Sequence, residues 1–596
     1  MESTGQAEAK AVASSSRTPS IASASPGRQH QDDHDSASTA ESDDLDLHRK
    51  ISQAYEEGHD ADVVGSALGP VRSHGRRPSL AMSRASARRT SNVNRVDAAD
   101  LEKGTGDDDE PGTAGDDATA DESLEVWWDS DDDPTNPFNW PQWQKVLNTT
   151  CISVMTFVTP LGSSIFAPGV PEVMNEFQSG SLLLASFVVS VYLLGFAFGP
   201  LLIAPLSEIY GRVIVYHVTN VGFTIFCVAC ALSPSLNALI VFRFFCGIFG
   251  CASVTNGGGT IADMIRQESR GVAMSLYSIG PLLGPIVGPV AGGFISQSLG
   301  WRWAFWVLAI IGGVVTVASF FVLKESFAYV ILQRKTNRLR KETGNPLLRS
   351  RLDAGLGQAD FFKRGIIRPV KMFIKSPIVV VTSLYMSLIY GYLYLMFTTM
   401  TTVFQGAYGF STGITGLAFL GLGVGNLAGL AIFSATSDKY IQRKAAEADA
   451  LAETTGAAKE GMKPEYRLPL LPVGAFLVPI GLFIYGWTAQ YHVHWIVPII
   501  SHVFIGIGNL VVFMALQTYL VDCFTIYAAS AIATNTVVRS VVGALLPLAG
   551  LPMFESLGLG WGNSLLGFIA VATIPISFVL IRWGESLRKR YPVRNL

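Results

Sequence analysis

The chain has 596 residues, of which 49% are hydrophobic and 15% are charged, and its formal net charge is −3. Charge is concentrated in residues 1–133 and in short polar breaks, whereas residues 146–583 consist mostly of apolar runs long enough to cross a bilayer, which takes about 20 residues. This pattern excludes a large soluble enzyme, and the lack of ~10-residue alternating segments excludes a membrane β-barrel. We therefore predict an all-α, polytopic membrane protein.

The first 133 residues are predicted to be a disordered, cytoplasmic N-terminal tail. They are rich in Ser, Ala, Gly, Asp and Arg and poor in aromatic residues, so they cannot bury enough apolar area to offset the entropy of ordering. Two Arg-Arg-x-Ser sites end at Ser79 and Ser91, and thirteen acidic residues without Lys or Arg follow in 107–133. Ser79 and Ser91 are candidate phosphorylation sites for a basophilic kinase. The alternative interpretation is a solvated tail without a specific role.

Twelve apolar runs follow and are predicted to be transmembrane helices. They span 146–166, 182–206, 212–232, 236–258, 271–296, 302–323, 376–403, 411–437, 468–489, 494–521, 527–553 and 561–583. The connection 324–375 carries thirteen Lys and Arg residues, and 438–467 and the C-terminal tail 584–596 are also basic. The alternate connections carry Arg302 as their one Lys or Arg residue. Because basic connections stay in the cytoplasm, both termini are predicted to be cytoplasmic.

The long connection after the sixth run divides the predicted helices into two halves, 134–323 and 376–583, joined by a cytoplasmic central loop, 324–375. An offset of 230 residues relates the end of the second run in each half. It pairs Gly195 with Gly425, Gly199 with Gly429, Ser207 with Ser437, Glu208 with Asp438 and Tyr210 with Tyr440. Parallel six-span repeats of this kind form one class of transporters, with the substrate site at the midplane between them.

The turn after the second run reads APLSEIYGRVIVY (204–216). Gly211 permits a tight turn, and Glu208 and Arg212 are predicted to form a charge pair, with Glu208 also able to face a neighbouring helix N-terminus. The segment resembles the cytoplasmic loop motif of the major facilitator superfamily. It departs from that motif at Ala204, Glu208 and Ile209. The resemblance implies the major facilitator fold and a latch that holds the two halves in the outward-facing state.

Arg243 lies inside the fourth apolar run, in the sequence RFFCG. An Arg at a helix centre costs at least ~2.5 kcal/mol, so it is a functional candidate by default. The sequence resembles the Arg-Phe-x-x-Gly motif of proton-coupled members of the superfamily, in which the Arg influences proton transfer. The alternative is an Arg that extends to the nearer membrane surface.

The stretch GPLLGPIVGPVAGGFI (280–295) resembles the fifth-span motif of drug:proton antiporters. The motif residues are Gly284, Pro285, Gly288, Pro289, Gly292 and Gly293. Small residues let helix backbones approach closely, so a generic packing face is the alternative. With stretches such as GWRWAFW (300–306), the region from about 134 to 590 resembles the fungal twelve-span drug:proton antiporters, which include polyamine and multidrug exporters.

Candidate substrate and proton groups are few. The substrate-cavity candidates are Tyr385, Tyr390, Tyr394, Asn426, Asn509, Gln517, Asn535 and Arg539. The candidates for proton coupling and gating are Arg243, Glu208, Arg212, Asp263, Asp438, Asp522 and His502. A Tyr-rich stripe at helical spacing is as often packing, and a lone His is more often a core residue. Cys227 and Cys230 form a CxxC without His or acidic neighbours, and the six cysteines are interpreted as small hydrophobic residues in the helices, not metal ligands.

The sequence thus predicts a monomeric, proton-driven antiporter without cofactor or metal that exports small amphipathic molecules, such as drugs or polyamines, across the plasma membrane. Its expected partners are protons, the lipid bilayer, the exported molecule and possible tail kinases, but not nucleic acid. A dedicated exporter of an endogenous secondary metabolite or organic acid is the first alternative, and a transporter-like nutrient sensor is the second. No enzyme activity is expected, because the spans lack a catalytic His/Asp/Glu or Ser/His group and an ATP-binding motif.

Overall fold

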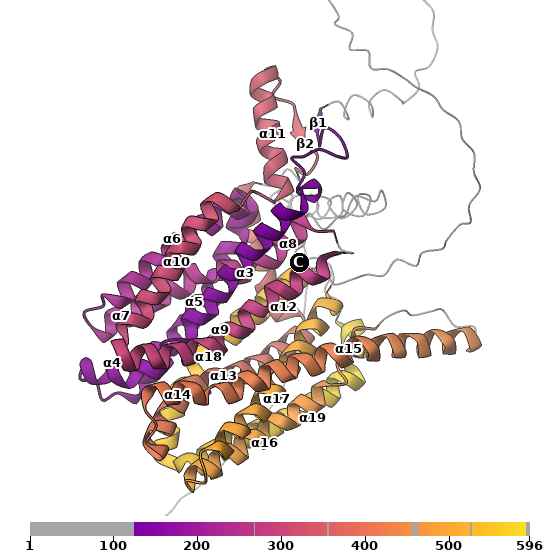
Figure 1. Ribbon diagram of the computed structural model, residues 1–596. Coiled ribbons are helices and arrows are strands. Elements are labelled where there is room, and N and C mark those ends of the chain that lie inside the picture. Colours follow the sequence, from indigo (N-terminus) through magenta and orange to yellow (C-terminus); the bar gives the residue numbers. More distant parts are fainter. Residues whose placement is uncertain (1–123, 267–268, 354–356, 456–462, 525–526, 592–596) are drawn as a thin grey trace, which may run out of the picture. The chain divides into compact units, whose positions relative to one another are not determined.

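The computed structural model describes residues 124–266, 269–353, 357–455, 463–524 and 527–591, and the fold given below is that of these residues (Figure 1). The candidate phosphorylation sites Ser79 and Ser91 and most of the predicted N-terminal tail lie outside the described residues. Almost all described secondary structure is helical, in agreement with the predicted all-α class.

The first half of the helical bundle contains the first six predicted spans. Its helices are α3 (Gln142–Ser164), α4 (Val170–Glu176), α5 (Leu182–Tyr210), α6 (Arg212–Ala231), α7 (Leu236–Gly250), α8 (Ala252–Met264), α9 (Arg270–Leu299) and α10 (Arg302–Val322), with short 3-10 turns η2 (Pro137–Asn139) and η3 (Ala167–Gly169). The α7 and α8 helices together form the fourth predicted span.

The second half contains the other six predicted spans. Its helices are α13 (Pro377–Tyr408), α14 (Thr412–Ala418), α15 (Leu420–Thr455), α16 (Leu471–Gln490), α17 (Ile496–Cys523), α18 (Ala528–Leu545) and α19 (Gly550–Arg590), with turns η5 (Pro464–Arg467) and η7 (Leu546–Ala549). Within the described residues, eleven helical segments are long and apolar enough to cross a membrane. The last of them, Ala528–Arg590, is broken at Gly558, where the backbone has φ 77°. This break separates the last two predicted spans, so all twelve are present.

The spans alternate in direction, which gives the bundle two faces. We call "basic face" the end that carries Gly211, the connection 324–375 and the turn η5, and "opposite face" the end that carries η3, Gly300 and Gly409. The predicted orientation places the basic face in the cytoplasm.

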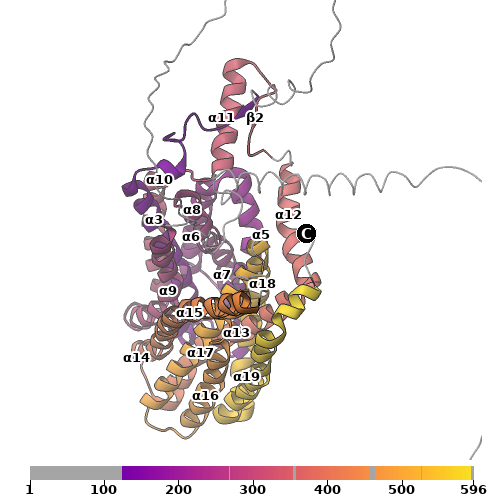
Figure 2. The same cartoon turned by 90° about the vertical axis from the view of Figure 1, so that its right-hand side faces the viewer.

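The central connection 324–375 is folded, although it was predicted as a loop. It contains α11 (Ala328–Thr343), β2 (Arg349–Ser350) and α12 (Gln358–Lys375). The α12 helix contacts α5 and α18, which belong to different halves (Figure 2). Thr534 of α18 donates a hydrogen bond to the carbonyl of Pro369 at 2.8 Å, and Gly365 packs on Pro205 of α5. At the basic face, α12 thus bridges the two halves.

The prediction of a disordered tail up to residue 133 is wrong for residues 124–133. The strand β1 (Glu125–Val126) pairs in parallel with β2, and Lys335 of α11 binds the Asp129 carboxylate at 2.6 Å. Burial alone would raise the pKa of Asp133, but hydrogen bonds from the hydroxyl and N–H of Thr135 and the N–H of Asp129, with the charge of Lys335, lower it. The acidic composition misled the prediction, because these carboxylates act as turn acceptors and ion-pair partners.

The halves also contact each other directly, from the opposite face to about the middle of the spans. Gln297 of α9 accepts a hydrogen bond from Gly413 N of α14 at 2.7 Å, and Thr401 of α13 donates to the carbonyl of Ala167. Nearer the middle, Ser190 of α5 donates to the carbonyl of Ala544 at 2.8 Å. The structure therefore has its halves joined at the opposite face.

Candidate functional site

The first cluster of charged residues lies at the basic face, where α5 ends and α6 begins. Arg212, which is 5% exposed, forms an ion pair with Asp263 at the end of α8, with Nε 3.2 Å from Oδ2. Its Nη1 donates to the hydroxyl of Ser207 at 2.7 Å, and its guanidinium lies 4.6 Å from the centre of the Phe327 ring. Three spans and the chain after α10 therefore meet at one buried guanidinium.

The predicted pair between Glu208 and Arg212 is wrong. Glu208 is exposed and forms no ion pair within the described part of the chain. The turn at Gly211 was expected, and with φ 102° it ends α5 between the two residues, but Arg212 at the start of α6 pairs with Asp263 and not with Glu208.

Glu325 is a member of this cluster that sequence reasoning missed. Its carboxylate accepts hydrogen bonds from the backbone N–H of Arg212 at 3.0 Å and of Val213 at 3.3 Å. It therefore satisfies the first free N–H groups of α6 and places a negative charge at a helix N-terminus, where it is favourable. An acidic residue two positions after the end of an apolar run was the available signal.

The second half carries a related cluster at the same face. Arg467 of η5 binds Asp522 at the end of α17 and Asp438 of α15, both at 2.9 Å. Asp438 and Asp522 were predicted, and Arg467, which joins them, was not. The guanidinium of Arg467 thus occupies the place in its half that Arg212 occupies in the first, next to a carboxylate at the end of the fourth span of that half.

Arg243 is buried in the middle of the first half and is 1% exposed. Its Nη2 donates to the carbonyls of Ser163 at 3.2 Å and Val189 at 3.3 Å. Three rings surround the guanidinium at 5.0 to 5.6 Å from their centres, those of Phe166, Tyr192 and Phe305. The alternative of an Arg that extends to the membrane surface is therefore wrong, and cation–π contacts with carbonyl acceptors hold its charge inside the bundle.

A chain of contacts leads from Arg243 into the second half. Ser163, whose carbonyl accepts from Arg243, also accepts through Oγ a hydrogen bond from the Tyr394 hydroxyl of α13 at 3.0 Å. The rings of Tyr394 and Tyr390 lie 5.1 Å apart, and the guanidinium of Arg539 lies 5.0 Å from the centre of the Tyr390 ring. Four predicted candidates, Arg243, Tyr390, Tyr394 and Arg539, are thus brought together near the middle of the bundle.

Two more predicted residues, Asn535 and Gln517, lie beside Arg539. The Asn535 amide donates to Oε1 of Gln517 at 3.3 Å, and one turn along both helices Arg539 of α18 lies 5.1 Å from the ring centre of Phe513 of α17. The Asn535 Oδ1 and the Arg539 Nε are buried without a hydrogen-bond partner among the described residues. Phe513 was missed because an apolar residue in an apolar run carries no distinguishing signal.

The remaining predicted cavity residues lie elsewhere. The Tyr385 hydroxyl is 3.4 Å from Ser577 Oγ, so this side chain packs between α13 and α19 and is not part of the group around Arg539. Asn426 and Asn509 are each 8% exposed, and the structure does not join them to that group by any described hydrogen bond.

His502 is fully buried in α17. Its Nδ1 is 2.6 Å from the carbonyl of Pro498 one turn earlier, and its ring packs on Tyr485. Because a carbonyl only accepts, Nδ1 carries a proton, while Nε2 has no hydrogen-bond partner among the described residues. The surroundings are those of a core histidine.

Four glycines of the stretch 280–295, three of them in the predicted antiporter motif, face α3 and the residue after it. A Cβ at Gly280 would lie 2.9 Å from Phe157 N, and one at Gly284 would lie 2.8 Å from Leu161 N. Gly288 and Gly292 meet Ser164 and Ile165 in the same way, whereas Gly293 faces Thr412 of α14 in the other half. The stripe therefore lets α9 lie against the backbone of α3 while its end contacts the second half.

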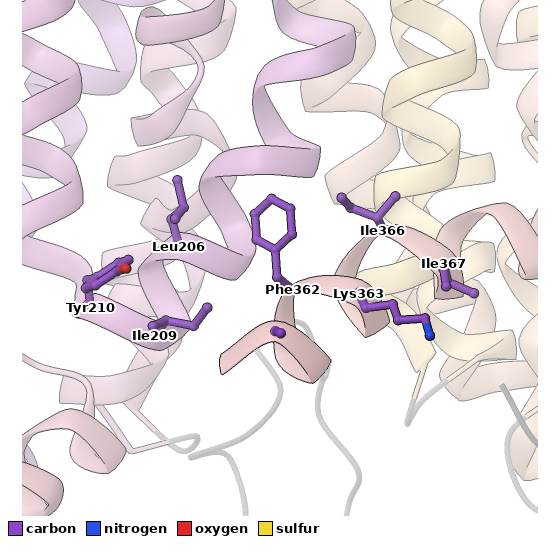
Figure 3. A pocket seen from close by; sticks show the side chains of 8 residues that line it. Leu206, Ile209, Tyr210, Phe362, Lys363, Ile366 and Ile367 are labelled. Atoms are coloured by element: carbon purple, nitrogen blue, oxygen red, sulfur yellow. The ribbon is translucent and has the colours of Figure 1, made fainter. Parts of the chain in front are cut away.

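A separate cavity of about 520 Å³ lies at the basic face between α5 and α12. Figure 3 shows Leu206 and Ile209 of α5 facing Phe362 and Ile366 of α12 across it. Its lining is mostly apolar, with Tyr210 and Lys363 as the polar groups. It does not include any residue of the group around Arg539.

Within the described residues, no group of His, Cys, Asp or Glu has the arrangement of a metal site. The Sγ atoms of Cys227 and Cys230 each lie 3.9 Å from that of Cys246, and all three residues are buried.

The comparisons with known proteins agree with this architecture. The family model of the Major Facilitator Superfamily matches residues 152–547. The chain is a fungal member of the major facilitator superfamily. It is similar to "MFS-type transporter tndD" of Aspergillus flavipes, with 56% identity over 466 residues that cover 78% of this chain and 86% of that protein. It is also similar to "Efflux pump radE" of Floropilus chiversii, with 52% identity over 463 residues that cover 78% of this chain and 84% of that protein.

Among solved structures, the fold of this major facilitator protein is similar to that of a D-xylose-proton symporter, with a TM-score of 0.53 and 18% identity over 72% of this chain and 97% of that chain. At that identity the likeness concerns the fold alone. The relatives and the twelve spans show a multi-pass membrane transporter of the major facilitator superfamily.

Proposed function

We propose that this major facilitator protein is a proton-coupled antiporter that exports small amphipathic molecules by alternating access between its two halves. The observation that carries the proposal is the chain from Arg243 through Ser163 to Tyr394. It connects a buried charge in one half to the seventh span in the other, so a change in the electrostatics around Arg243 acts on a contact between the halves. The name of the relative called an efflux pump supports the outward direction.

Alternating access requires that the contacts at the opposite face open while those at the basic face close. The bonds to release are few and local, such as Gln297 with Gly413 N and Thr401 with the Ala167 carbonyl. At the basic face, α12 lies between α5 and α18, so closure there requires α12 to shift. Opening at the opposite face must therefore release these hydrogen bonds, each worth about 0.5–1.5 kcal/mol, and also the close packing of α9 on α14.

The proposed proton sites are the carboxylates that bind the two basic-face arginines. Protonation of Asp263 or Asp522 removes the negative charge that holds Arg212 or Arg467, and this weakens the junction of three helices in that half. Glu208, Asp438 and His502 stay as further candidates, and proton flow down the gradient would supply the driving force without a cofactor.

The test is flux in proteoliposomes that contain a trapped pH-sensitive dye. With a proton gradient, efflux of a substrate should be accompanied by proton uptake of matching size, and a protonophore should stop both. Arg243→Ala should abolish the coupled flux, and Arg302→Ala, which removes an Arg at the opposite face, should not. Flux that is unchanged by collapse of the gradient would contradict proton coupling while leaving transport itself intact.

We further propose that the protein is a monomer in the plasma membrane with cytoplasmic termini, and that a basophilic kinase modifies Ser79 and Ser91. Protease treatment of intact cells should leave tags at both termini protected.

A second candidate function is a dedicated exporter of an endogenous organic acid or other metabolite, which is favoured by the arginines at mid-span. A deletion strain that accumulates one product, with unchanged resistance to drugs, would select this alternative.

A further inference from the structure

The interior of the spans is unbalanced in charge. The described carboxylates of the transmembrane helices lie at the two faces. These are Glu208, Asp263, Asp438, Asp522 and Glu585 at the basic face, Glu447 and Asp449 on the part of α15 that extends beyond that face, and Glu172, Glu176 and Glu555 at the opposite face. Between the faces lie two arginines, Arg243 of α7 and Arg539 of α18. The middle of the described bundle is therefore cationic without a counter-charge.

The two arginines differ in how their charge is accommodated. Arg243 donates from Nη2 to two carbonyls and is surrounded by three rings, and although its Nε has no partner among the described residues, it is only 1% exposed, so a ligand cannot reach it in this state. Arg539 is only half-buried and has no hydrogen bond or ion pair within the described part of the chain. Its contacts are with the faces of two rings, Tyr390 at 5.0 Å and Phe513 at 5.1 Å.

A guanidinium has five N–H donors and no acceptor, and ring faces do not satisfy them. Placing such a group inside a membrane bundle is expensive, and a hydrogen-bonded anion offsets the cost best, because the carboxylate geometry matches the guanidinium fork. The Nε of Arg539 is already shielded from water, which strengthens a bond to an incoming anion.

The surroundings of Arg539 fit an acidic molecule with a flat, conjugated body. Asn535 lies one turn before it on α18 and has a buried, unused Oδ1, while Gln517 holds the amide nitrogen of Asn535. Tyr390, Tyr394 and Phe513 supply ring faces next to the guanidinium. Tyr390 and Tyr394 belong to α13, Arg539 to α18, and Tyr394 contacts the first half through Ser163. A ligand held here would therefore touch a contact between the halves.

We propose that Arg539 anchors the acidic group of the exported molecule, and that the substrates are organic anions with an aromatic or conjugated body. This inference rests on the proposed function, because it names the substrate class of the same transporter. Arg243 is not a ligand in this arrangement, and its charge adds to the positive potential that attracts the anion. A cationic drug or polyamine would meet two arginines and no carboxylate at mid-span, which disfavours it.

The test uses the purified full-length protein in detergent and a panel of flat aromatic and conjugated carboxylic acids, each paired with its primary amide. Affinity is measured by thermal stabilisation at increasing ligand concentration. We expect the wild-type protein to bind at least one acid about ten-fold or more tightly than its amide, as the loss of one charge-assisted hydrogen bond predicts. Arg539→Gln should remove the preference, and Arg539→Lys should keep part of it.

The control variant is Arg302→Gln, which removes the same charge at the opposite face, where Arg302 binds Glu176. It should keep the preference for acids. Equal binding of every acid and its amide, or a preference that survives in Arg539→Gln, would overturn the inference. Tighter binding of the matching aromatic amines would overturn it as well.

The outcome is separable from that of the proposed function. If acids bind through Arg539 but their flux ignores the proton gradient, the substrate class stands and proton coupling fails. If coupled flux of amines and neutral compounds is measured while acids do not bind, the antiporter stands and the role of Arg539 fails.

Discussion

The two halves of the bundle carry the same kinds of charged group at different levels of burial. At the basic face of the first half, the side chains of Arg212 and Asp263 are 6% and 5% exposed, whereas those of Arg467 and Asp522 in the second half are 17% and 30% exposed. The mid-span arginines follow the same trend, since Arg243 is 1% exposed and donates to two carbonyls, whereas Arg539 is half-buried and has no hydrogen bond within the described part of the chain. From this comparison we propose that the first half is the more rigid frame and that the second half presents the more accessible of the groups that meet protons and substrate.

The proposed exchange of a proton for an organic anion has an energetic consequence for transport. In the proposed exchange, one proton enters and one organic monoanion leaves, so both steps move charge in the direction favoured by an inside-negative membrane. Each charge contributes about 2.3 kcal/mol per 100 mV, and together they contribute about 4.6 kcal/mol per 100 mV. An exporter of anions would thus use the potential twice, which a carrier of cations cannot do.

Removal of Arg243 should give the largest effect. Arg243→Leu removes the donor to Ser163 and Val189 and the charge at the centre of three rings, so we expect export to fall at least ~100-fold, corresponding to about 3 kcal/mol of lost coupling. Arg243→Lys should retain a small part of the activity, because an ammonium lacks the planar fork. Efflux is measured after the amount of protein in the membrane has been matched. Wild-type export by Arg243→Leu would assign this residue a purely structural role. The functional contrast between Arg243 of the first half and Arg539 of the second half would then no longer hold.

The two basic-face clusters should respond unequally to the same substitution. Asp263→Asn leaves a buried guanidinium without its charge partner and should cost ~3–5 kcal/mol of stability, seen as a large drop in the detergent melting temperature. Asp522→Asn affects a pair that is partly in contact with solvent and should cost about 1 kcal/mol or less. Equal losses in the two variants would show that burial does not distinguish the halves.

Much of this architecture could be predicted from the sequence because apolar length and basic connections specify spans locally. Arg243 was found because a single charge in an apolar run is conspicuous. The fixed offset of 230 found Asp438 but could not find Arg467, since Arg212 lies four positions after Glu208 whereas Arg467 lies 29 positions after Asp438. A constant offset cannot pair Arg212 with Arg467, because the loops that precede them in the two halves differ in length.

Other features depend on contacts that the sequence does not encode locally. The partner of Arg212 is Asp263, which lies 51 residues away, because a glycine turn separates Arg212 from the nearer Glu208. The isolation of Arg539 depends on how α13 and α17 approach α18, which depends on the packing of the whole half. Tyr385 and Tyr394 share one helix and one residue type, yet one packs on α19 and the other reaches α3. Only the tertiary structure shows that the two tyrosines have different surroundings.

The contact that joins the two regions should show a medium effect. Tyr394→Phe removes the hydroxyl that donates to Ser163 Oγ, and Ser163→Ala removes the acceptor while keeping the carbonyl that binds Arg243. Each should reduce export by about two- to ten-fold, as the loss of a hydrogen bond worth ~0.5–1.5 kcal/mol predicts. The double variant should be no worse than either single one. Additive losses would mean that the two side chains act separately and that the chain from Arg243 does not cross between the halves.

The smallest effect is expected at the segment 124–133, which packs on α11 away from the mid-span arginines. Lys335→Ala removes the partner of Asp129 and a donor to the Trp127 carbonyl, and the exposed ion pair itself contributes little. We expect faster proteolysis near Asp129 and unchanged export. The depressed pKa of Asp133 means that its contribution to stability is fully present above its ordinary value of 3.8 and is lost only as the pH falls through the lower folded value. Protection from proteolysis should therefore stay constant between about pH 5 and pH 8. A fall in export in Lys335→Ala would show that this segment, and not the second half alone, takes part in the transport cycle.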